Sequence, residues 1–241
     1  MNRHYAPVDE ILTLSEAASY LKLAERTIHR MIQRTEIPCA RVGGQWRFVK
    51  AVLDDWLISR MQVLPRNELE PLLQLTDGIV RLAPMIDTNS VVDTIEPGSP
   101  KTVLTQLIEP LVTRGIIRNA GPFVTSLLAR EKLSSTALGH GVAVPHVRRP
   151  GDNIEGLPPV VLGICRAGVD FNTPDDMPVH FFFLLGTTSE VVHLRLLKRI
   201  TILFRDNSLN GTLLAEESRS GLLRTLADYE ERLFPGGSNV D

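Results

Sequence analysis

The run Val179–Leu185, which reads Val-His-Phe-Phe-Phe-Leu-Leu, constrains the fold of this chain more than any other segment. Apolar side chains at nearly every position predict a central strand covered on both faces, and the run is far shorter than the roughly 20 residues of a membrane-spanning helix. The other expected strands are 90–95, 142–145 and 160–165. The helices expected to alternate with the strands are 100–115, 122–130, 189–204 and 220–233. This order predicts an α/β domain with a mixed sheet flanked by helices.

Two of these helices have recognisable ends. Ser99 and Pro100 provide an N-cap and a proline at the first helical position, and Gly115 is the expected end of that helix. Ser189 is the expected N-cap of the helix 189–204, which places His193 in its first turn.

The first sixty residues have a different pattern, that of a compact helical unit ending in the helix 50–60. Beyond it, Pro65, Pro71 and Pro84 interrupt regular structure. We therefore expect an α+β chain of two domains, with a small domain at 1–60, a linker at 61–76 and the α/β domain at 77–236.

Composition argues against several classes of protein. The chain is 43% hydrophobic with a formal net charge of -2, as is ordinary for a soluble globular protein. Its two cysteines, Cys39 and Cys165, are far apart, so neither a disulfide framework nor a cysteine zinc site is expected. With no secretory signal or membrane span visible, a cytoplasmic location is expected. An aromatic content of 5% argues against a protein that stacks single-stranded bases.

Positive charge is concentrated near the N-terminus. Between Lys22 and Lys50, seven lysines and arginines stand against two glutamates, in a chain that is slightly acidic overall. Such asymmetry indicates a surface that faces a polyanion. Two helices are expected here, one from a Thr13 cap to Leu21 and one at 25–34. The segment 41–48 alternates around two consecutive glycines, which predicts a tight hairpin.

The candidate DNA-binding residues lie on the outer face of the second helix and on the hairpin. They are Arg26, Thr27, His29, Arg30 and Gln33 on the helix, and Arg41 and Arg47 on the hairpin. A helix pair with a cationic outer face suits the major groove, whose walls are phosphates, and a basic hairpin suits a wing laid on the DNA backbone.

Several short motifs fall in this region. They are Leu12-Thr-Leu-Ser-Glu-Ala-Ala18, Thr27-Ile-His-Arg30, Ile37-Pro38, Arg41-Val-Gly-Gly44, Trp46-Arg-Phe48 and Leu53-Asp-Asp-Trp-Leu57. Over about residues 11–58 the chain resembles the excisionase/MerR-like winged helix-turn-helix family, which implies a DNA-binding domain. The family has a serine-like cap where Ala24 stands and a glycine where Thr35 or Glu36 stands. The second helix is therefore expected to start and end differently from the family norm.

The α/β domain carries three further motifs. They are Leu127-Leu-Ala-Arg-Glu-Lys-Leu-Ser-Ser-Thr136, Gly139-His-Gly-Val-Ala-Val-Pro-His146 and His193-Leu-Arg-Leu-Leu-Lys198. In this order they resemble the fructose/mannitol-type IIA domains of the phosphotransferase system, including the nitrogen-regulatory branch, over about residues 77–235. The resemblance implies three catalytic residues, with His146 as phosphoryl acceptor, Arg130 as charge stabiliser and His193 as accessory residue.

The residue types suit this chemistry. Histidine offers an unprotonated ring nitrogen near neutral pH, because its reference pKa is about 6.5. Arg130 can hold phosphate oxygens in a two-pronged contact, and Ser135, Thr136 and Gly141 are further candidate phosphate-binding residues through hydroxyl and amide donors. A covalent phosphohistidine is expected with no metal and no organic cofactor, and the implied donor is an HPr-like phosphocarrier protein.

Together these features predict a cytoplasmic DNA-binding regulator whose IIA-type domain is a phosphoryl carrier rather than a free-standing metabolic enzyme. DNA and a second copy of the chain, in a homodimer, are the other expected partners, and phosphorylation of His146 is expected to change DNA affinity. One alternative is a IIA component that relays phosphate to a separate sugar-specific IIB partner. Another is a DNA-binding protein with an inactive IIA fold. A metal site formed by His140, His146 and His193 is a further alternative.

Overall fold

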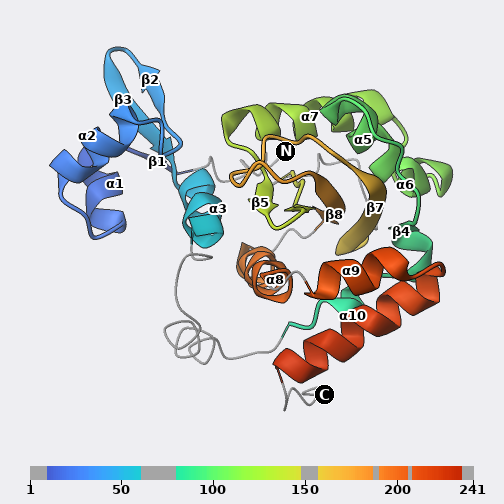
Figure 1. The fold of residues 1–241 in the computed structure, drawn as a ribbon. Helices are drawn as coiled ribbons and strands as arrows, with labels where there is room; N and C mark the ends of the chain where they lie inside the picture. The colour runs from blue at the N-terminus through green and yellow to red at the C-terminus, as the bar shows by residue number, and fades with distance from the viewer. Residues whose placement is uncertain (1–9, 61–79, 148–156, 187–189, 206–207, 235–241) are drawn as a thin grey trace, which may run out of the picture. The chain divides into compact units, whose positions relative to one another are not determined.

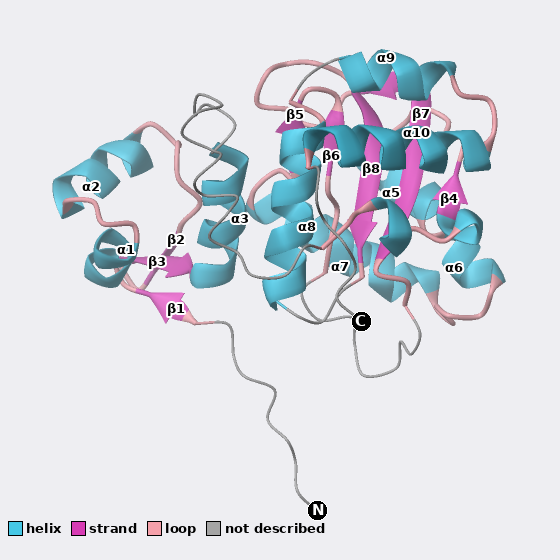
Figure 2. Cartoon of the chain, turned by 90° about the horizontal axis from the view of Figure 1, so that it is seen from below, coloured by secondary structure: helices cyan, strands magenta, loops and turns pink. Residues whose placement is uncertain are grey.

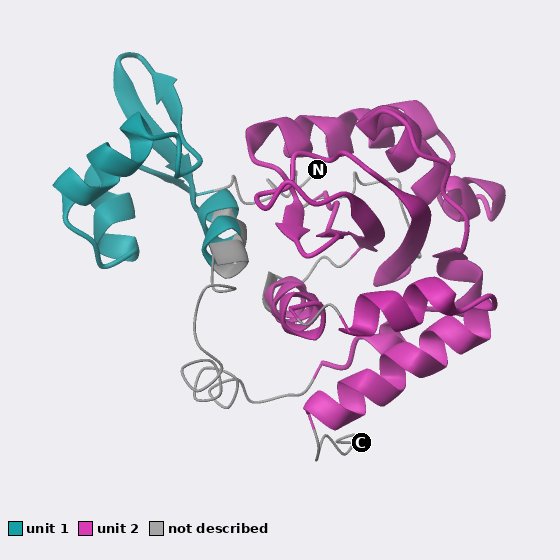
Figure 3. Ribbon diagram, viewed as in Figure 1, with its two compact units in different colours: residues 1–61 teal, residues 62–241 magenta. Residues whose placement is uncertain are grey.

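The computed structural model describes residues 10–60, 80–147, 157–186, 190–205 and 208–234. The chain divides into two compact units, residues 1–61 and 62–241, each considered on its own below (Figure 3). The linker expected at 61–76 and the expected N-cap Ser189 lie outside the described residues.

Over residues 10–60 the first unit contains three helices and a small sheet. The helices are α1 (Leu14–Tyr20), α2 (Glu25–Gln33) and α3 (Lys50–Arg60). The strands β1 (Ile11–Leu12), β2 (Ala40–Val42) and β3 (Gln45–Val49) form an antiparallel sheet in the order β1-β3-β2. A capping box starts α1, because Thr13 Oγ1 accepts the Glu16 amide at 3.3 Å and the Glu16 carboxylate accepts the Thr13 amide at 2.8 Å.

The hairpin and the ends of α2 follow from single residues. Gly43 and Gly44 have φ of +56° and +78°, the pair of positive values that a two-residue hairpin of this kind requires. Ala24 begins α2 without a side-chain cap, as expected. After α2, Thr35 takes φ of +57°, while its amide and that of Glu36 donate to Ile32 O and Met31 O. This is a Schellman ending whose left-handed residue is usually glycine, so Thr35 is the residue that stands in its place.

The second unit is built on a five-stranded mixed sheet in the order β4-β7-β8-β6-β5 (Figure 1). Its strands are β4 (Val91–Val92), β5 (Ala137–Gly139), β6 (Val142–Ala143), β7 (Val160–Val169) and β8 (Val179–Leu185). β4 runs parallel to β7 and β6 parallel to β8, whereas β7–β8 and β5–β6 are antiparallel. The prediction that Val179–Leu185 is a central strand is confirmed, and so is the predicted fold class.

Two short 3-10 turns, η2 (Ala83–Met85) and η3 (Thr88–Ser90), precede the sheet. The helices of this unit are α5 (Pro100–Leu107), α6 (Glu109–Thr113), α7 (Ala120–Leu133), α8 (Glu190–Leu203), α9 (Ser208–Ala215) and α10 (Arg219–Leu233). The prediction of one helix over 100–115 was wrong. The helix is interrupted at Ile108, two residues before Pro110, and splits into α5 and α6. A proline inside a helix lacks the amide donor and crowds the preceding turn.

Helices cover both faces of the sheet, with α5 and α7 on one side and α8, α9 and α10 on the other (Figure 2). Successive side chains of β8 pack against the helices on opposite faces of the sheet. Phe182 belongs to the core cluster shared with α5 and α7, whereas the rings of Phe181 and Phe183 each lie 5.3 Å from that of Phe204, which follows α8. At Gly163 of β7 a Cβ would come within 2.6 Å of Leu107 on α5, so close helix–sheet packing requires glycine there.

A buried ion pair between α8 and α10 binds the backbone of residues 80–83, the first described segment of the second unit. Glu230 of α10 accepts the amides of Leu82 and Ala83 at 2.7 and 3.1 Å and pairs with Arg199 of α8 at 3.1 Å. Arg199 also donates to the Val80 carbonyl at 3.1 Å. In the parts of the chain that the structure describes, no helix is long and apolar enough to cross a membrane.

Candidate functional site

His146 lies just beyond β6, where it forms a parallel bridge with Leu185 at the end of β8. Its side chain is only 2% exposed, and both ring nitrogens are engaged. Nδ1 is 2.9 Å from the Val144 carbonyl oxygen, and Nε2 accepts a hydrogen bond from Nε of Arg130 at 3.2 Å. A carbonyl oxygen has no proton to give, so Nδ1 carries the proton and Nε2 presents the lone pair.

Arg130 reaches this ring from the last turn of α7. Its terminal NH1 donates to the Ser134 carbonyl at 2.8 Å, just past the end of the helix. The guanidinium is therefore held at two points, with Nε directed at His146. This position lets a planar cation meet the oxygens of a group arriving at Nε2.

His193 completes the group. It lies in the first turn of α8, is 7% exposed, and its ring centroid is 4.6 Å from that of His146, with the planes at 62°. The N-terminal end of a helix favours negative charge, because its amides and dipole point toward it. The structure thus brings the three predicted catalytic residues together from α7, the end of β6 and α8.

The other predicted phosphate-binding residues, Ser135, Thr136 and Gly141, have hydrogen-bond partners other than His146 in the structure. The Ser135 hydroxyl donates to the Phe171 carbonyl at 3.1 Å, and the Thr136 hydroxyl donates to the Glu131 carboxylate. Gly141 lies at the opposite end of β6, about 16 Å from His146 along an extended chain. Its contacts there are with the amides of β8 that begin at His180. Gly141 is therefore remote from Nε2 of His146, whereas the hydroxyls of Ser135 and Thr136 are hydrogen-bonded to other groups.

His140 also lies at the far end of β6. It sits in the turn between β5 and β6 with φ of +53°, and its amide donates to Asp175 at 2.6 Å. A metal site combining His140 with His146 and His193 is excluded by this separation. Within the described ranges, no three His, Cys, Asp or Glu side chains are grouped to hold a metal ion. His180 donates through Nδ1 to the Cys165 carbonyl at 3.0 Å, across the pairing of β7 with β8.

The N-terminal unit places its predicted residues on its surface. On α2, Arg26, His29, Arg30 and Gln33 are exposed and Thr27 is half-buried, while Ile28 is fully buried beneath them. The helix is therefore two-sided, with a polar, largely cationic outer face. A recognition helix requires an outer face of this kind.

The hairpin carries its two arginines close to its own backbone. Arg41 donates through Nε to the Gly44 carbonyl at 3.3 Å, and its guanidinium lies 5.6 Å from the ring centroid of Trp46. Arg47 donates to the Trp46 carbonyl at 2.9 Å and to Gln45 Oε1 at 2.6 Å. These contacts hold both guanidinium groups against the hairpin, with Arg41 exposed and Arg47 half-buried.

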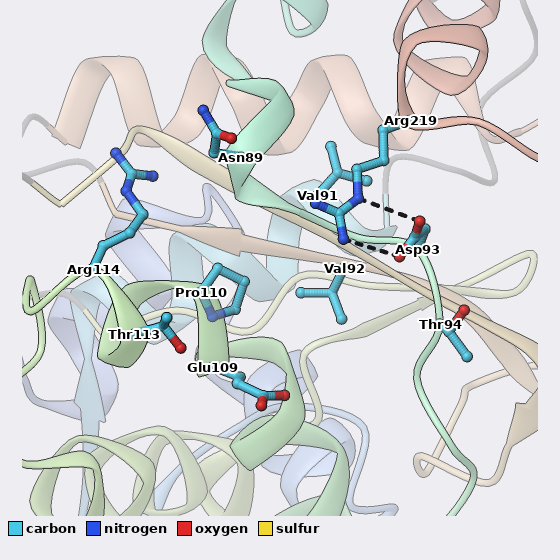
Figure 4. A pocket seen from close by; sticks show the side chains of 10 residues that line it. All are labelled: Asn89, Val91, Val92, Asp93, Thr94, Glu109, Pro110, Thr113, Arg114 and Arg219. Carbon is cyan, nitrogen blue, oxygen red and sulfur yellow. Dashed lines mark hydrogen bonds and ion pairs between the residues drawn. The ribbon is translucent and has the colours of Figure 1, made fainter.

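A separate pocket of about 560 Å³ lies along β4, at the opposite edge of the sheet from β5 (Figure 4). Val91, Val92 and Pro110 are among its apolar lining residues. A two-pronged ion pair between Arg219 and Asp93, at 3.2 and 3.3 Å, stands at one side. The pocket shares no lining residue with the histidine group, so it is not part of that site.

Comparison with known families agrees with both units. Residues 85–229 match the family described as "Phosphoenolpyruvate-dependent sugar phosphotransferase system, EIIA 2", and residues 11–61 match a helix-turn-helix domain family. The chain belongs to the EIIA 2 family, with a helix-turn-helix domain at its N-terminal end.

The second unit is similar to several individual proteins of this family. The chain is 31% identical over 159 residues to the nitrogen regulatory protein of Pseudomonas aeruginosa, covering 63% of this chain and 98% of that one. It is 23% identical over 154 residues to the fructose-specific EIIABC component of Bacillus subtilis, of which it spans only 24%. The solved structure of nitrogen regulatory protein IIA-Ntr from Neisseria meningitidis superposes with a TM-score of 0.51 at 26% identity, covering 60% of this chain and 97% of that one.

Some residues of the site were not assigned from the sequence. The carbonyls of Ser134 and Val144 position Arg130 and His146, and backbone acceptors leave no trace in residue type. Glu131 was visible as part of the Arg-Glu motif, but its partner Thr136 becomes evident only when the chain is folded.

Proposed function

We propose that this protein is a DNA-binding regulator whose IIA domain accepts a phosphoryl group on Nε2 of His146 from an HPr-like phosphocarrier. The observation that carries the proposal is the state of the His146 ring, with its proton on Nδ1 and its lone pair on Nε2 beneath the Arg130 guanidinium. A histidine kept only for packing does not require an arginine directed at the nitrogen lone pair.

The transfer proceeds in one displacement. The Nε2 lone pair attacks the phosphorus of the donor phosphohistidine, the donor's P–N bond breaks, and its electron pair returns to the donor ring. Arg130 moves from the lone pair to the phosphoryl oxygens, where its charge stabilises the transition state. His193 and the first turn of α8 face the same group. The Nδ1 proton stays hydrogen-bonded to Val144 throughout, so the product is a ring phosphorylated on Nε2.

The regulatory half of the proposal rests on the first unit. Its exposed helix face and basic hairpin are suited to duplex DNA, and they share a chain with the phosphoryl acceptor. We propose that phosphorylation changes DNA affinity, and that the protein acts as a homodimer in the cytoplasm.

The phosphoryl half is tested by incubating the full chain with phosphoenolpyruvate, enzyme I and an HPr protein, and measuring acid-labile phosphate. We expect label on the wild type, no label on His146→Ala, and wild-type label on the control His140→Ala. Label that persists in His146→Ala would contradict the acceptor assignment.

The regulatory half is tested separately by gel-shift titration of phosphorylated and unphosphorylated protein. We expect sequence-selective binding whose affinity changes with phosphorylation. Equal affinities, together with rapid passage of the label to a sugar-specific IIB domain, would favour a transport relay. A protein that binds DNA but takes no label would instead have an inactive IIA fold.

A further inference from the structure

The stability of α7 does not explain why a carboxylate occupies position 131. It lies in the last turn of α7, where the helix dipole disfavours a negative charge. Both of its oxygens lie 3.0 Å from the Thr136 amide, and the Thr136 hydroxyl donates to one of them. The carboxylate therefore binds the chain that leaves the helix, five residues further on.

Thr136 passes this restraint to the strand that carries His146. Its carbonyl accepts the Val144 amide at 2.9 Å, and the Val144 carbonyl accepts Nδ1–H of His146 at 2.9 Å. On the other side of that strand, the Leu185 amide donates to the Pro145 carbonyl at 3.1 Å. Thr136, Val144 and His146 are each at most 5% exposed, so water competes little for these hydrogen bonds.

The neighbouring Arg130 contacts His146 as well. It donates to the Ser134 carbonyl and to Nε2 of His146, so the histidine is reached from α7 by two routes. One route passes through Arg130 directly, and the other passes from Glu131 through Thr136 and Val144 to Nδ1. Adjacent residues of one helix turn thus act on the two nitrogens of the same ring.

We propose that Glu131, acting through Thr136, is a positioning residue for phosphoryl transfer that holds His146 in the Nδ1–H tautomer with Nε2 as the attacking atom. This inference rests on the proposed phosphoryl-acceptor function of His146. When the Val144 carbonyl moves out of reach of Nδ1, the proton can occupy Nε2. In that ring form Nε2 can neither accept from Arg130 nor attack phosphorus.

The experiment compares four variants of the full chain. Glu131→Ala removes both acceptor oxygens, and Thr136→Val removes a single hydroxyl while keeping the side-chain shape. Thr136→Ser keeps both donors, and Glu217→Gln changes an exposed carboxylate on the same unit as a control. For each, the rate of phosphorylation is measured against the concentration of phosphorylated HPr, and the His146 ring state is read by nitrogen-15 NMR.

We expect Glu131→Ala to lower the maximal rate about 10- to 100-fold with little change in the half-saturating donor concentration, because docking is untouched and only the attacking atom is displaced. Thr136→Val should show a smaller loss, and Thr136→Ser and Glu217→Gln wild-type rates. The ring of the two impaired variants should show a mixture of tautomers.

A wild-type rate and a pure Nδ1–H ring in folded Glu131→Ala or Thr136→Val would overturn the inference. So would a slower rate with an unchanged ring, since the effect would then not pass through His146. If the wild type takes no label at all, the proposed function fails. The NMR comparison still decides whether Glu131 sets the tautomer.

Discussion

The guanidinium Nε of Arg130 donates to Nε2 of His146 at 3.2 Å, so the arginine covers the atom that we propose as the phosphoryl acceptor. Its second anchor, the Ser134 carbonyl at 2.8 Å, keeps the guanidinium beside the ring when the first contact is broken. The same side chain can thus shield the nucleophile at rest and neutralise phosphoryl oxygens during transfer. Both roles follow from the five donors that arginine carries in one plane.

Two replacements of Arg130 distinguish the effect of its positive charge from the effect of its planar guanidinium shape. We expect Arg130→Gln to slow phosphorylation of His146 by roughly 100- to 1000-fold, as loss of a transition-state donor does elsewhere. Arg130→Lys should recover only part of this, because an ammonium cannot make the two-pronged contact. Single-turnover labelling with phosphorylated HPr measures both rates, with the exposed Arg118→Gln as control. Equal rates for wild type and Arg130→Gln would remove Arg130 from the reaction.

The elements with a strong periodic or composition signal were predictable. The apolar run of β8, the Gly43-Gly44 hairpin, the start of the helix at Pro100 and the helix near Ser220 all appear within a few residues of their predicted positions. The short strand β5 and the helix α9 were not predicted. β5 is only three residues long and is defined by its pairing with β6, and pairing partners leave no periodic signal in one segment.

Some residues of the site were predictable from the sequence and others were not. His146, Arg130 and His193 were predicted because their motifs resemble a family, and the fold brings them together. Gly141 was expected at the phosphate because glycines expose amides. The direction of β6 instead carries it to the far end of the sheet, and strand direction is a property of the whole fold.

The Glu230–Arg199 pair is expected to dominate the stability of the second unit's first segment. Glu230→Ala leaves a buried guanidinium and the amides of Leu82 and Ala83 without their acceptor, so a loss of about 3–5 kcal/mol is expected. The adjacent Glu231 pairs with Arg81 at 2.8 Å on the surface, and Glu231→Ala should cost less than about 1 kcal/mol. Urea unfolding followed by far-ultraviolet circular dichroism compares the two. Similar losses would show that burial does not matter here.

The Arg219–Asp93 pair predicts a modest pH dependence. The hydrogen bond from Arg219 lowers the pKa of Asp93. A carboxyl group with a lower pKa in the folded state adds stability above its unfolded pKa of about 3.9, and this is lost as pH falls through the folded pKa. Both side chains are more than a third exposed, so solvent screening keeps the contribution below about 1 kcal/mol.

Asp93→Asn should therefore be less stable than wild type at pH 7, and the difference should narrow below about pH 5 as the wild-type carboxylate takes up a proton. High salt should narrow it at pH 7 as well. Urea midpoints at several pH values measure the difference, with the exposed Asp228→Asn as control. A difference that grows as the pH falls would contradict the direction of the pKa shift.

DNA binding by the first unit should carry an electrostatic signature. Arg30 is exposed on α2, and replacing it with alanine should weaken binding to mixed-sequence duplex DNA. If Arg30 contacts one phosphate, the slope of log K against log salt should become less steep by about 1. Fluorescence anisotropy over a salt series measures this slope, and Arg118→Ala on the second unit should leave it unchanged. An unaltered slope for Arg30→Ala would place DNA elsewhere on the protein.

Thr35 offers a test of the backbone analysis. A β-branched residue at φ of +57° costs about 1–2 kcal/mol, because its Cβ crowds the backbone in the left-handed region. Thr35→Gly removes that strain but gains freedom in the unfolded chain, so a net stabilisation of about 0.5–1 kcal/mol is expected.

Both tryptophans of the chain, Trp46 and Trp56, lie in the first unit, so their fluorescence follows the melting of that unit within the full-length protein. Arg34→Gly is the matched control, because Arg34 has φ of -93° and a glycine there relieves no strain. We expect the melting temperature to rise for Thr35→Gly and to fall for Arg34→Gly. A fall in both would mean that the left-handed turn after α2 is not strained by threonine.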